Sequence, residues 1–249
     1  MVFPITQKFL ETESSNKINV PTNSSFLITQ TNTFIYLLVN ICSFNGEHMY
    51  LRKSTVKVLQ VFTSHITETF TLREIARKIK MHISLAHRAF QPLLERGIVQ
   101  HDKHKHLHLN YMIEHETLAF VESLKKDEFL KKRKNQDLKL FIEEIIHKIK
   151  EDNFILLLFG SVVESDKPRD IDVLLIVDNI KKIEFHEKFL HNITSNYSLP
   201  FEERVISFES VNEMLAKREE INVMNELLNK HIMLYGGELF YRLVQRGRR

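Results

Sequence analysis

Cysteine is nearly absent from this chain of 249 residues, with Cys42 as its single example. One cysteine excludes a disulfide framework and any zinc site built from several cysteines, and it favours a reducing, cytoplasmic setting. Glycine and proline are also scarce, at six and five residues. With 43% hydrophobic and 27% charged residues, the composition indicates a globular protein rather than a disordered or fibrous one.

Long hydrophobic runs are missing as well. The apolar stretch 33–44 is interrupted by Asn40 and Ser43, and it is shorter than the roughly 20 apolar residues of a membrane-spanning helix. It follows no basic segment, so it does not resemble a secretory signal, and we expect no membrane partner. Residues 1–48 are rich in Ser, Thr and Asn, which predicts a poorly structured extension. An alternative hypothesis takes Met49 as the natural start.

Charge is unevenly distributed although the net charge is only +3. Residues 51–110 contain eleven Lys and Arg against four Asp and Glu, which gives this segment +7 and the rest of the chain −4. A basic module joined to an acidic one indicates that one half binds a polyanion and the other half has a different task.

The basic segment has the pattern of a small helical module with a hairpin. A helix begins near residue 53, and a second one, 72–79, follows the capping box formed by Thr71 and Glu74. A third helix, capped by Ser84, is expected to end at Gly97. Two short strands around a polar tip, over residues 98–109, predict a β-hairpin.

This order of elements resembles a winged helix-turn-helix. The resemblance implies that the third helix enters the major groove of DNA and that the hairpin tip lies near phosphate or the minor groove. Such modules also dock proteins, which stays open as the alternative. If the module reads a palindrome, a homodimer is expected. The implied nucleic-acid-binding residues are Ser84, His87, Arg88 and Gln91 on the helix, and Lys103, His104 and Lys105 on the hairpin.

A helical connector and a second domain follow. Apolar residues keep helical spacing over residues 113–150, and the basic stretch 125–135 fits either a solvated face or an extension of a nucleic-acid surface. The predicted organisation is therefore an extension 1–48, a winged helix 49–112, the connector 113–150, and a C-terminal domain 151–249. In that last domain a helix over 211–229 and a terminal helix over 238–244 are expected.

The chemistry-bearing residues lie between two strand patterns. Residues 154–159 are all apolar, as in a strand buried on both faces, and Gly160-Ser161 closes this strand with a tight turn. A second apolar strand begins at Asp170. Residues two apart on a strand share a face, so Asp170 and Asp172 project together. Paired carboxylates at the edge of an apolar sheet favour a divalent metal, with Mg²⁺ or Mn²⁺ suited to oxygen ligands.

Gly-Ser at the end of one strand and Asp-x-Asp at the head of the next resemble the DNA polymerase β-type nucleotidyltransferase superfamily in its minimal form. The resemblance implies that Gly160 and Ser161 contact the phosphates of a nucleoside triphosphate and that the aspartate pair holds two metal ions. It also implies a third carboxylate on a later strand, and over residues 201–208 we favour Glu203 over Glu202. Lys167 and Arg169 are either further phosphate contacts or plain surface charges.

These patterns predict an α+β protein in which a winged helix-turn-helix precedes a mixed sheet with flanking helices. Its expected activity is metal-dependent transfer of a nucleoside monophosphate from a nucleoside triphosphate to an acceptor hydroxyl, with nucleic acid bound by the winged helix. The alternative is a DNA-binding regulator, or an antitoxin-like protein with a protein partner, whose transferase domain is weakly active or inactive. A third carboxylate within reach of both aspartates favours the enzyme.

Overall fold

The structure, a computed structural model, describes residues 51–133, 136–165 and 168–249. The predicted extension 1–48 and the Met49 start lie outside the described residues. Leu51–Arg249 form one compact unit in which helices combine with two small β-sheets, so the α+β class is confirmed. Within the described ranges, none of the helices has the length and apolar character that a membrane-spanning segment needs.

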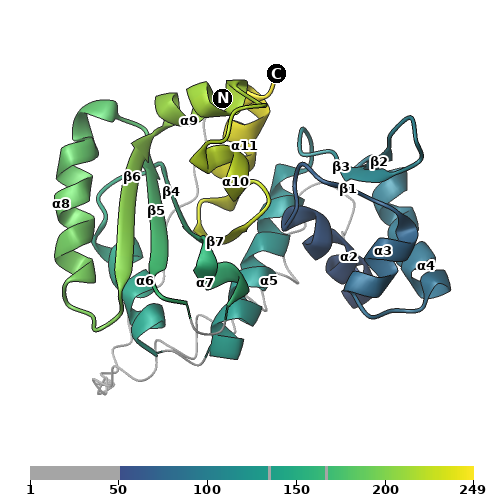
Figure 1. The fold of residues 1–249 in the computed structure, drawn as a ribbon, viewed down its shortest axis with the longest axis horizontal. Helices are drawn as coiled ribbons and strands as arrows, with labels where there is room; N and C mark the ends of the chain where they lie inside the picture. Colours follow the sequence, from purple (N-terminus) through teal and green to yellow (C-terminus); the bar gives the residue numbers. More distant parts are fainter. Residues whose placement is uncertain (1–50, 134–135, 166–167) are drawn as a thin grey trace, which may run out of the picture. The chain divides into compact units, whose positions relative to one another are not determined.

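The first part of the unit packs three helices against a three-stranded antiparallel sheet (Figure 1). The sheet has the order β1-β3-β2, and β2 and β3 form the predicted hairpin. Phe62 is fully buried at the centre and meets the rings of Phe70 and Phe90 edge to face, with centroids 5.7 and 5.8 Å away. The elements are α2 (Lys53–Thr63), β1 (Thr69–Phe70), α3 (Leu72–Lys78), α4 (Ile83–Glu95), β2 (Val99–His101) and β3 (Leu107–Leu109).

Side-chain hydrogen bonds cap the N-termini of α3 and α4. The capping box is confirmed, because the Glu74 amide donates to Thr71 Oγ1 at 3.3 Å and the Thr71 amide donates to Glu74 Oε2 at 2.7 Å. The predicted cap at Ser84 is wrong: α4 begins at Ile83, and His82 Nδ1 accepts from the Ser84 amide at 3.3 Å. An imidazole nitrogen thus replaces the usual hydroxyl or carboxylate acceptor. Strand β1 was not predicted, because two residues are too short to show alternation.

The predicted helical connector is present as α5 (His115–Arg133) and α6 (Gln136–Lys148). Helix α5 packs against α2 on one side and against β7 and α11 on the other. Its basic residues differ in environment, since Lys131 and Lys132 are exposed whereas Lys125 is buried. The expected solvated face therefore holds for the end of α5 but not for its middle.

The second sheet has the strand order β6-β5-β4-β7 (Figure 1). Strand β4 pairs antiparallel with β5 and β7, while β5 and β6 run parallel. Every residue of β4 is buried, as the unbroken apolar run predicts for a strand that is covered on both faces. The strands are β4 (Phe154–Phe159), β5 (Ile171–Val177), β6 (Phe201–Ser207) and β7 (His231–Tyr235).

Two sets of helices cover this sheet. One face packs on α6 and α8, whose residues Phe141 and Leu190 share a core with Leu156 and Leu158 of β4. The other face, with Leu157 of β4, packs on α5 and on the helices that follow β6. The remaining helical elements are α7 (Ser161–Glu164), η1 (Ile180–Lys182), α8 (Ile183–Thr194), α9 (Phe208–Ala216), α10 (Val223–Leu227) and α11 (Gly237–Gly247).

The expected helix over residues 211–229 is wrong in one respect, because two shorter helices, α9 and α10, take its place. Helix α9 ends at Ala216. Asn222 then caps α10, because its side-chain oxygen accepts from the Asn225 amide at 2.9 Å. Ile221, which the periodic pattern assigns to the apolar stripe, is 94% exposed in this break. The terminal helix is present, and it begins one residue earlier than expected.

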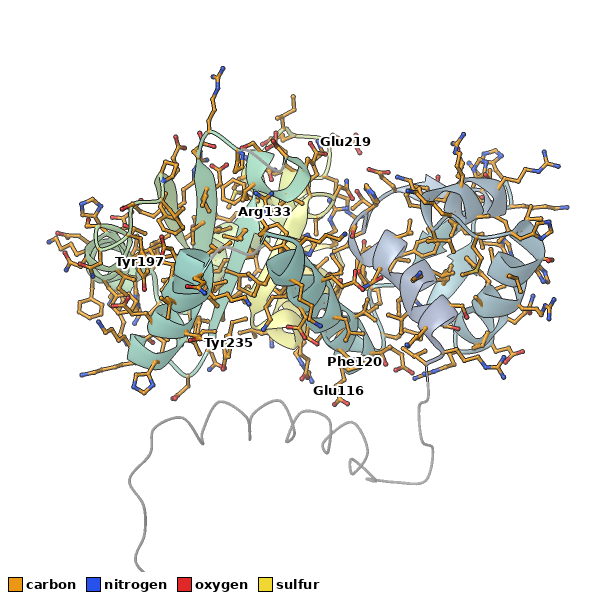
Figure 2. The ribbon with its side chains drawn as sticks, turned by 90° about the horizontal axis from the view of Figure 1, so that it is seen from below. Glu116, Phe120, Arg133, Tyr197, Glu219 and Tyr235 are labelled. Atoms are coloured by element: carbon orange, nitrogen blue, oxygen red, sulfur yellow. The ribbon has the colours of Figure 1, made fainter. Side chains whose placement is uncertain are left out.

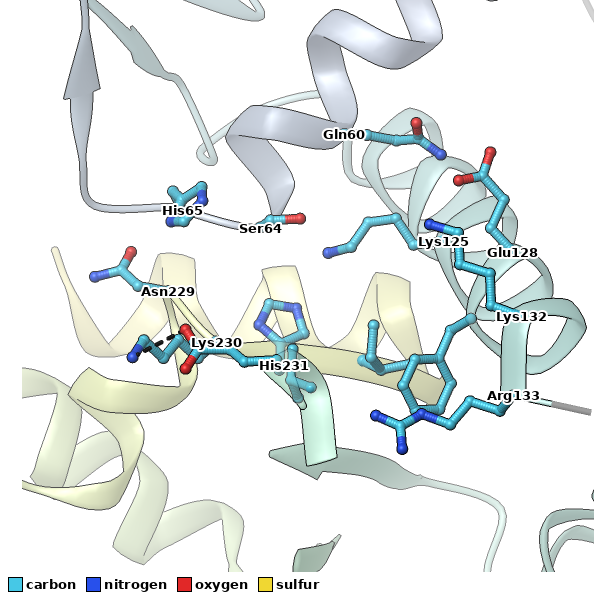
Figure 3. A pocket seen from close by; sticks show the side chains of 14 residues that line it. Gln60, Ser64, His65, Lys125, Glu128, Lys132, Arg133, Asn229, Lys230 and His231 are labelled. Carbon is cyan, nitrogen blue, oxygen red and sulfur yellow. Dashed lines mark ion pairs between the residues drawn. The ribbon is translucent and has the colours of Figure 1, made fainter. Parts of the chain in front are cut away.

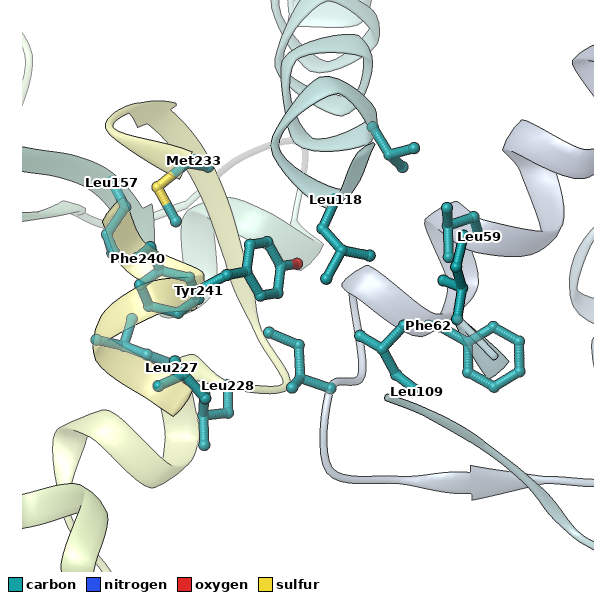
Figure 4. Packing of buried hydrophobic residues seen from close by; sticks show 14 of the residues in the cluster. Leu59, Phe62, Leu109, Leu118, Leu157, Leu227, Leu228, Met233, Phe240 and Tyr241 are labelled. Atoms are coloured by element: carbon teal, nitrogen blue, oxygen red, sulfur yellow. The ribbon is translucent and has the colours of Figure 1, made fainter. Parts of the chain in front are cut away.

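One hydrophobic cluster runs through both parts of the unit (Figure 4). It joins Leu59 and Phe62 of α2 to Leu157 of β4 and to Phe240 and Tyr241 of α11. The junction also has backbone contacts, since the Ile66 amide donates to the Leu228 carbonyl at 3.0 Å. Elements before and after the connector therefore share a core.

Candidate functional site

A sharp turn carries the chain from β4 into the short helix α7. Gly160 has φ +67° and ψ −146°, a conformation open mainly to glycine. A Cβ atom at this position would lie 2.2 Å from Oδ2 of Asp172, so the carboxylate occupies the space that a side chain would need. The turn that sequence reasoning singled out thus brings Gly160 and Asp172 into direct contact.

The two aspartates meet this turn from the neighbouring strand. Asp172 lies opposite Phe159 in the β4–β5 register, and Asp170 precedes β5. Ser161 Oγ donates to Asp170 Oδ1 at 3.3 Å. The four predicted site residues of the Gly160-Ser161 turn and the Asp-x-Asp segment therefore lie together where β4 ends and β5 begins.

Asp172 is surrounded by negative charge. Burial raises the pKa of its carboxyl group, and the charges of Asp170 and then Glu202 raise it further. The Arg204 guanidinium acts in the opposite direction and offsets part of this effect. Three carboxylates with one nearby cation form a site that would gain from a bound divalent cation.

The preference for Glu203 as third carboxylate does not fit the structure. Strands β5 and β6 run parallel with Asp172 opposite Glu202, so these two side chains share a face. Glu203 points to the other face, where its Oε1 lies 2.6 Å from His191 Nδ1 and accepts from Thr194 Oγ1 at 3.3 Å. Glu202 is the carboxylate beside the aspartate pair, and Glu203 belongs to the packing of α8 on β6.

Arg204 is a site residue that sequence reasoning missed. Its guanidinium lies 5.6 Å from the centre of the Phe159 ring, at the end of β4. Being two residues after Glu202, it faces the same side of the sheet. The sequence did show that Glu202 and Arg204 share one face of the predicted strand, because they are two residues apart. It did not show which face of that strand lies beside the aspartates.

Two further residues, Arg169 and Lys167, are predicted phosphate contacts. Arg169 is exposed and directly precedes Asp170. Lys167 lies outside the described residues. A cation from a different element also contacts the loop after Ser161. Arg133, labelled in Figure 2 at the end of α5, donates hydrogen bonds to the backbone carbonyls of Val162 and Ser165.

The side-chain atoms near the turn that could coordinate a metal are carboxylate and hydroxyl oxygens, which are the ligands that a hard cation prefers. Asp170 and Asp172 are the residues that would hold a metal ion, with Glu202 next to them. Among the described residues the structure contains no group of three or more His, Cys, Asp or Glu side chains already arranged around a common metal position. The carboxylates are thus neighbours without forming a closed ligand shell.

An open cleft of about 710 Å³ lies next to the turn. Phe159, Gly160 and Ser161 form one wall, and the other comes from the segment around α10. Side chains that sequence reasoning did not single out line the rest of the cleft: the amides of Asn222, Asn225 and Asn229, the ammonium of Lys230, and the carboxylates of Glu68, Glu164, Glu220 and Glu226. The cleft is large enough for a nucleotide-sized ligand.

The predicted nucleic-acid contacts lie on an accessible surface of the first part. Ser84, His87 and Arg88 are exposed on α4, while Gln91 is half-buried and its Nε2 lies 3.2 Å from His87 Nε2. The hairpin tip is ordered by Asp102, whose Oδ1 accepts from the amides of His104 and His106 at 2.8 Å. The exposed residues of that tip are Lys103, His104 and Lys105.

No family model matches the sequence, and neither the curated proteins nor the solved structures contain a match.

Proposed function

We propose that this protein is a metal-dependent nucleotidyltransferase that moves a nucleoside monophosphate from a nucleoside triphosphate to an acceptor hydroxyl. The observation that carries the proposal is the position of Glu202, a third carboxylate beside Asp172 and Asp170 at the Gly160-Ser161 turn. Repulsion among three carboxylates is costly unless a cation or a proton enters, which a metal-dependent site exploits.

In this proposal the turn and the cleft bind the triphosphate. Glycine at position 160 leaves room for the Asp172 carboxylate beside the turn, and the Lys230 ammonium at the cleft supplies a hydrogen-bond donor. Asp170 and Asp172 would hold Mg²⁺ or Mn²⁺, which neutralises charge on the reacting phosphate when bound. The acceptor oxygen bonds to the α-phosphorus, the bond to the β-phosphate oxygen breaks, and pyrophosphate leaves. Glu202 takes the proton of the acceptor hydroxyl.

We further propose that residues 49–112 act as a winged helix-turn-helix that recruits nucleic acid, followed by a connector and a polymerase β-like domain. The order of three helices and a hairpin supports this proposal, as do the exposed cations Arg88 on α4 and Lys103 and Lys105 at the hairpin tip. Arg88 on α4 and Lys103 on the tip are the contacts that best fit base and phosphate recognition, respectively.

Transfer of label from α-labelled nucleoside triphosphates tests the enzyme directly. The protein, mixed RNA and a host lysate serve as acceptors, with Mg²⁺ or Mn²⁺ present. Incorporation should vanish in Asp170→Ala/Asp172→Ala and fall strongly in Glu202→Gln. Glu203→Gln is the matched control, because it removes the same charge one residue away on the other face. Equal activity of Glu202→Gln and the wild type would contradict the assignment.

A second candidate function is a DNA-binding regulator whose transferase-like domain senses nucleotide. It is favoured by three exposed cations, Arg88 on α4 and Lys103 and Lys105 at the hairpin tip, which no part of the transfer chemistry requires. Binding of duplex DNA that is weakened in Arg88→Ala, together with nucleotide binding and no label transfer, would support the regulator over the enzyme.

A further inference from the structure

The wall of the cleft around α10 is held at both ends of this helix. After α10, the Lys230 ammonium pairs with the Glu164 carboxylate of α7 at 3.1 Å (Figure 3). Strand β7 begins next, with His231 opposite Phe159 in the sheet, so Lys230 lies beside the Gly160 turn. This end of the wall is therefore fixed where the proposed site needs a donor for phosphate.

The end of the wall before α10 depends on the side chain of Asn225. Its amide nitrogen donates to the carbonyls of Lys217 and Glu220 at 3.0 and 2.8 Å, and these bonds close the loop 217–222 between α9 and α10. Its amide oxygen accepts from the Arg248 guanidinium at 2.7 Å. A cation that follows α11 thus secures the side chain that shapes this loop.

Arg248 reaches Asn225 because α11 packs closely on α9. A Cβ atom at Gly247 would lie 2.7 Å from the Leu215 Cβ, so this close approach requires glycine. The Arg248 carbonyl in turn accepts from the Arg218 guanidinium of the loop. Arg248 therefore holds α10 with its side chain and the loop with its backbone.

The loop presents an apolar side chain to the cleft. Ile221 lines the cleft and is 94% exposed, more than any other large hydrophobic side chain among the described residues. Covering an apolar side chain with another apolar surface is favourable, whereas a phosphate gains nothing from such a contact. Ile221 and Lys230 line the same cleft from opposite ends of α10, which suits a ligand with a base at one end and phosphates at the other.

We infer that Arg248 is a positioning residue for the nucleotide, which acts through Asn225 to hold Ile221 against the nucleobase. The inference rests on the proposed function and adds the contact that the base would make. An isoleucine packs on the face of any base, so the site is expected to discriminate little among the four nucleobases. Because the Lys230 end of the wall has its own support, loss of Arg248 should loosen the base contact and leave the phosphate contacts intact.

Isothermal titration calorimetry on the full chain tests this assignment, with ATP and inorganic triphosphate as separate ligands in the presence of Mg²⁺. Ile221→Ser should raise the dissociation constant of ATP about tenfold, because apolar contact area is lost, and leave that of triphosphate unchanged. Arg248→Ala should weaken ATP binding with the same selectivity. Ile180→Ser, at an exposed isoleucine of η1, and Arg246→Ala, at an exposed arginine of α11, are the matched controls and should bind like wild type.

An effect of Arg248 that passes through Asn225 has two further signatures. Asn225→Ala should weaken ATP binding, and adding Arg248→Ala to this variant should cause no further loss, since the two side chains act as one unit. In label transfer, Arg248→Ala should raise the KM for the nucleoside triphosphate and leave kcat within about twofold of wild type, because only substrate binding is weakened.

The outcomes separate this inference from the proposed enzyme. Wild-type ATP affinity in either Ile221→Ser or Arg248→Ala would overturn the inference while the proposed function stands. Equal losses for ATP and triphosphate would indicate general damage to the cleft and overturn the base contact. ATP binding that depends on both residues, without label transfer that is lost in Asp170→Ala/Asp172→Ala, would overturn the enzyme alone. Binding of another nucleoside triphosphate but not of ATP would overturn the inference, and binding of none would overturn both.

Discussion

Replacing Glu122 with glutamine is expected to destabilise the protein by about 3–5 kcal/mol, the usual cost of breaking a buried ion pair. Glu122 is 1% exposed in the middle of α5. Its carboxylate lies 2.9 Å from Lys125 Nζ, accepts from Tyr241 OH at 2.9 Å, and is 3.3 Å from His231 Nε2. Lys125 also donates to the Thr63 carbonyl at 3.2 Å, so the cluster joins α2, α5, β7 and α11.

The magnitude also follows from the pKa of Glu122. Burial alone would raise this pKa, but Lys125 and His231 outweigh burial and lower it from an ordinary 4.5 to about 2. A difference of this size corresponds to about 3 kcal/mol of stability from the charged carboxylate. Removing the charge of Glu122 also leaves the buried Lys125 ammonium without its ion-pair partner. The expected loss of unfolding free energy therefore lies in the upper part of the range.

The sign of the pH dependence is fixed by the same shift. Because the folded pKa of Glu122 lies below the unfolded value, its stabilisation is complete above about pH 4.5. The stabilisation is then lost as the pH falls toward 2 and the folded protein takes up the proton. Between these values the wild type should lose stability with falling pH more steeply than Glu122→Gln.

Urea unfolding and thermal melting at neutral and acid pH measure this effect. A loss of 3–5 kcal/mol corresponds to a drop in Tm of about 6–20 °C for a chain of this size. Glu184→Gln, which breaks the exposed pair with Lys188, should have no measurable effect. Glu122→Gln/Lys125→Met should recover most of the stability, because no buried ammonium stays unpaired while the amide oxygen still accepts from Tyr241 OH. A loss below about 1 kcal/mol in Glu122→Gln, or a double variant no better than the single one, would refute the reasoning.

Three further changes probe the site and its surroundings. Gly160→Ala should cost at least about 1–3 kcal/mol in urea unfolding and abolish transfer, since its Cβ would lie 2.2 Å from Asp172 Oδ2; wild-type stability would contradict this. Glu202→Gln should lower the pKa of Asp172 toward its ordinary value in an NMR carboxyl titration, because one of the charges that raise it is gone; an unchanged pKa would place Glu202 too far away. Asn222→Ala should destabilise the protein by about 1 kcal/mol in thermal melting through loss of the α10 cap, and no change would deny that the cap matters.

The strands at the site could be predicted from sequence because their signal is local. Residues 154–159 are apolar without a break, and the structure makes the same six residues β4. The tight turn at Gly160 and the neighbouring aspartates followed from residue type and spacing. What sequence could not supply was the face of β6 that meets them. Alternation separates Glu202 from Glu203, but only the register with β5 tells which of the two lies beside Asp172.

Other features depend on partners distant in sequence. Glu122 and Lys125 look like members of a charged helix surface, and their burial follows from β7 and α11, more than 100 residues further on. The break between α9 and α10 was missed because the apolar spacing continues through Ile221, while the cap at Asn222 is a weaker signal. Periodicity predicts that a face is apolar, but it does not show that the chain keeps the helix intact over that face.

The packing of α5 changes what the predicted connector means for function. A flexible link would leave a nucleic acid bound at α4 free to move relative to the Gly160 turn. Instead α5 shares a core with α2 and with the sheet, its Lys125 holds the Thr63 carbonyl, and its Arg133 holds the carbonyls after Ser161. One helix thus fixes the end of α2 and the turn at the site within the same unit. Under the proposed function, such fixed geometry would present one segment of a bound nucleic acid to the transfer site and so restrict which hydroxyl reacts.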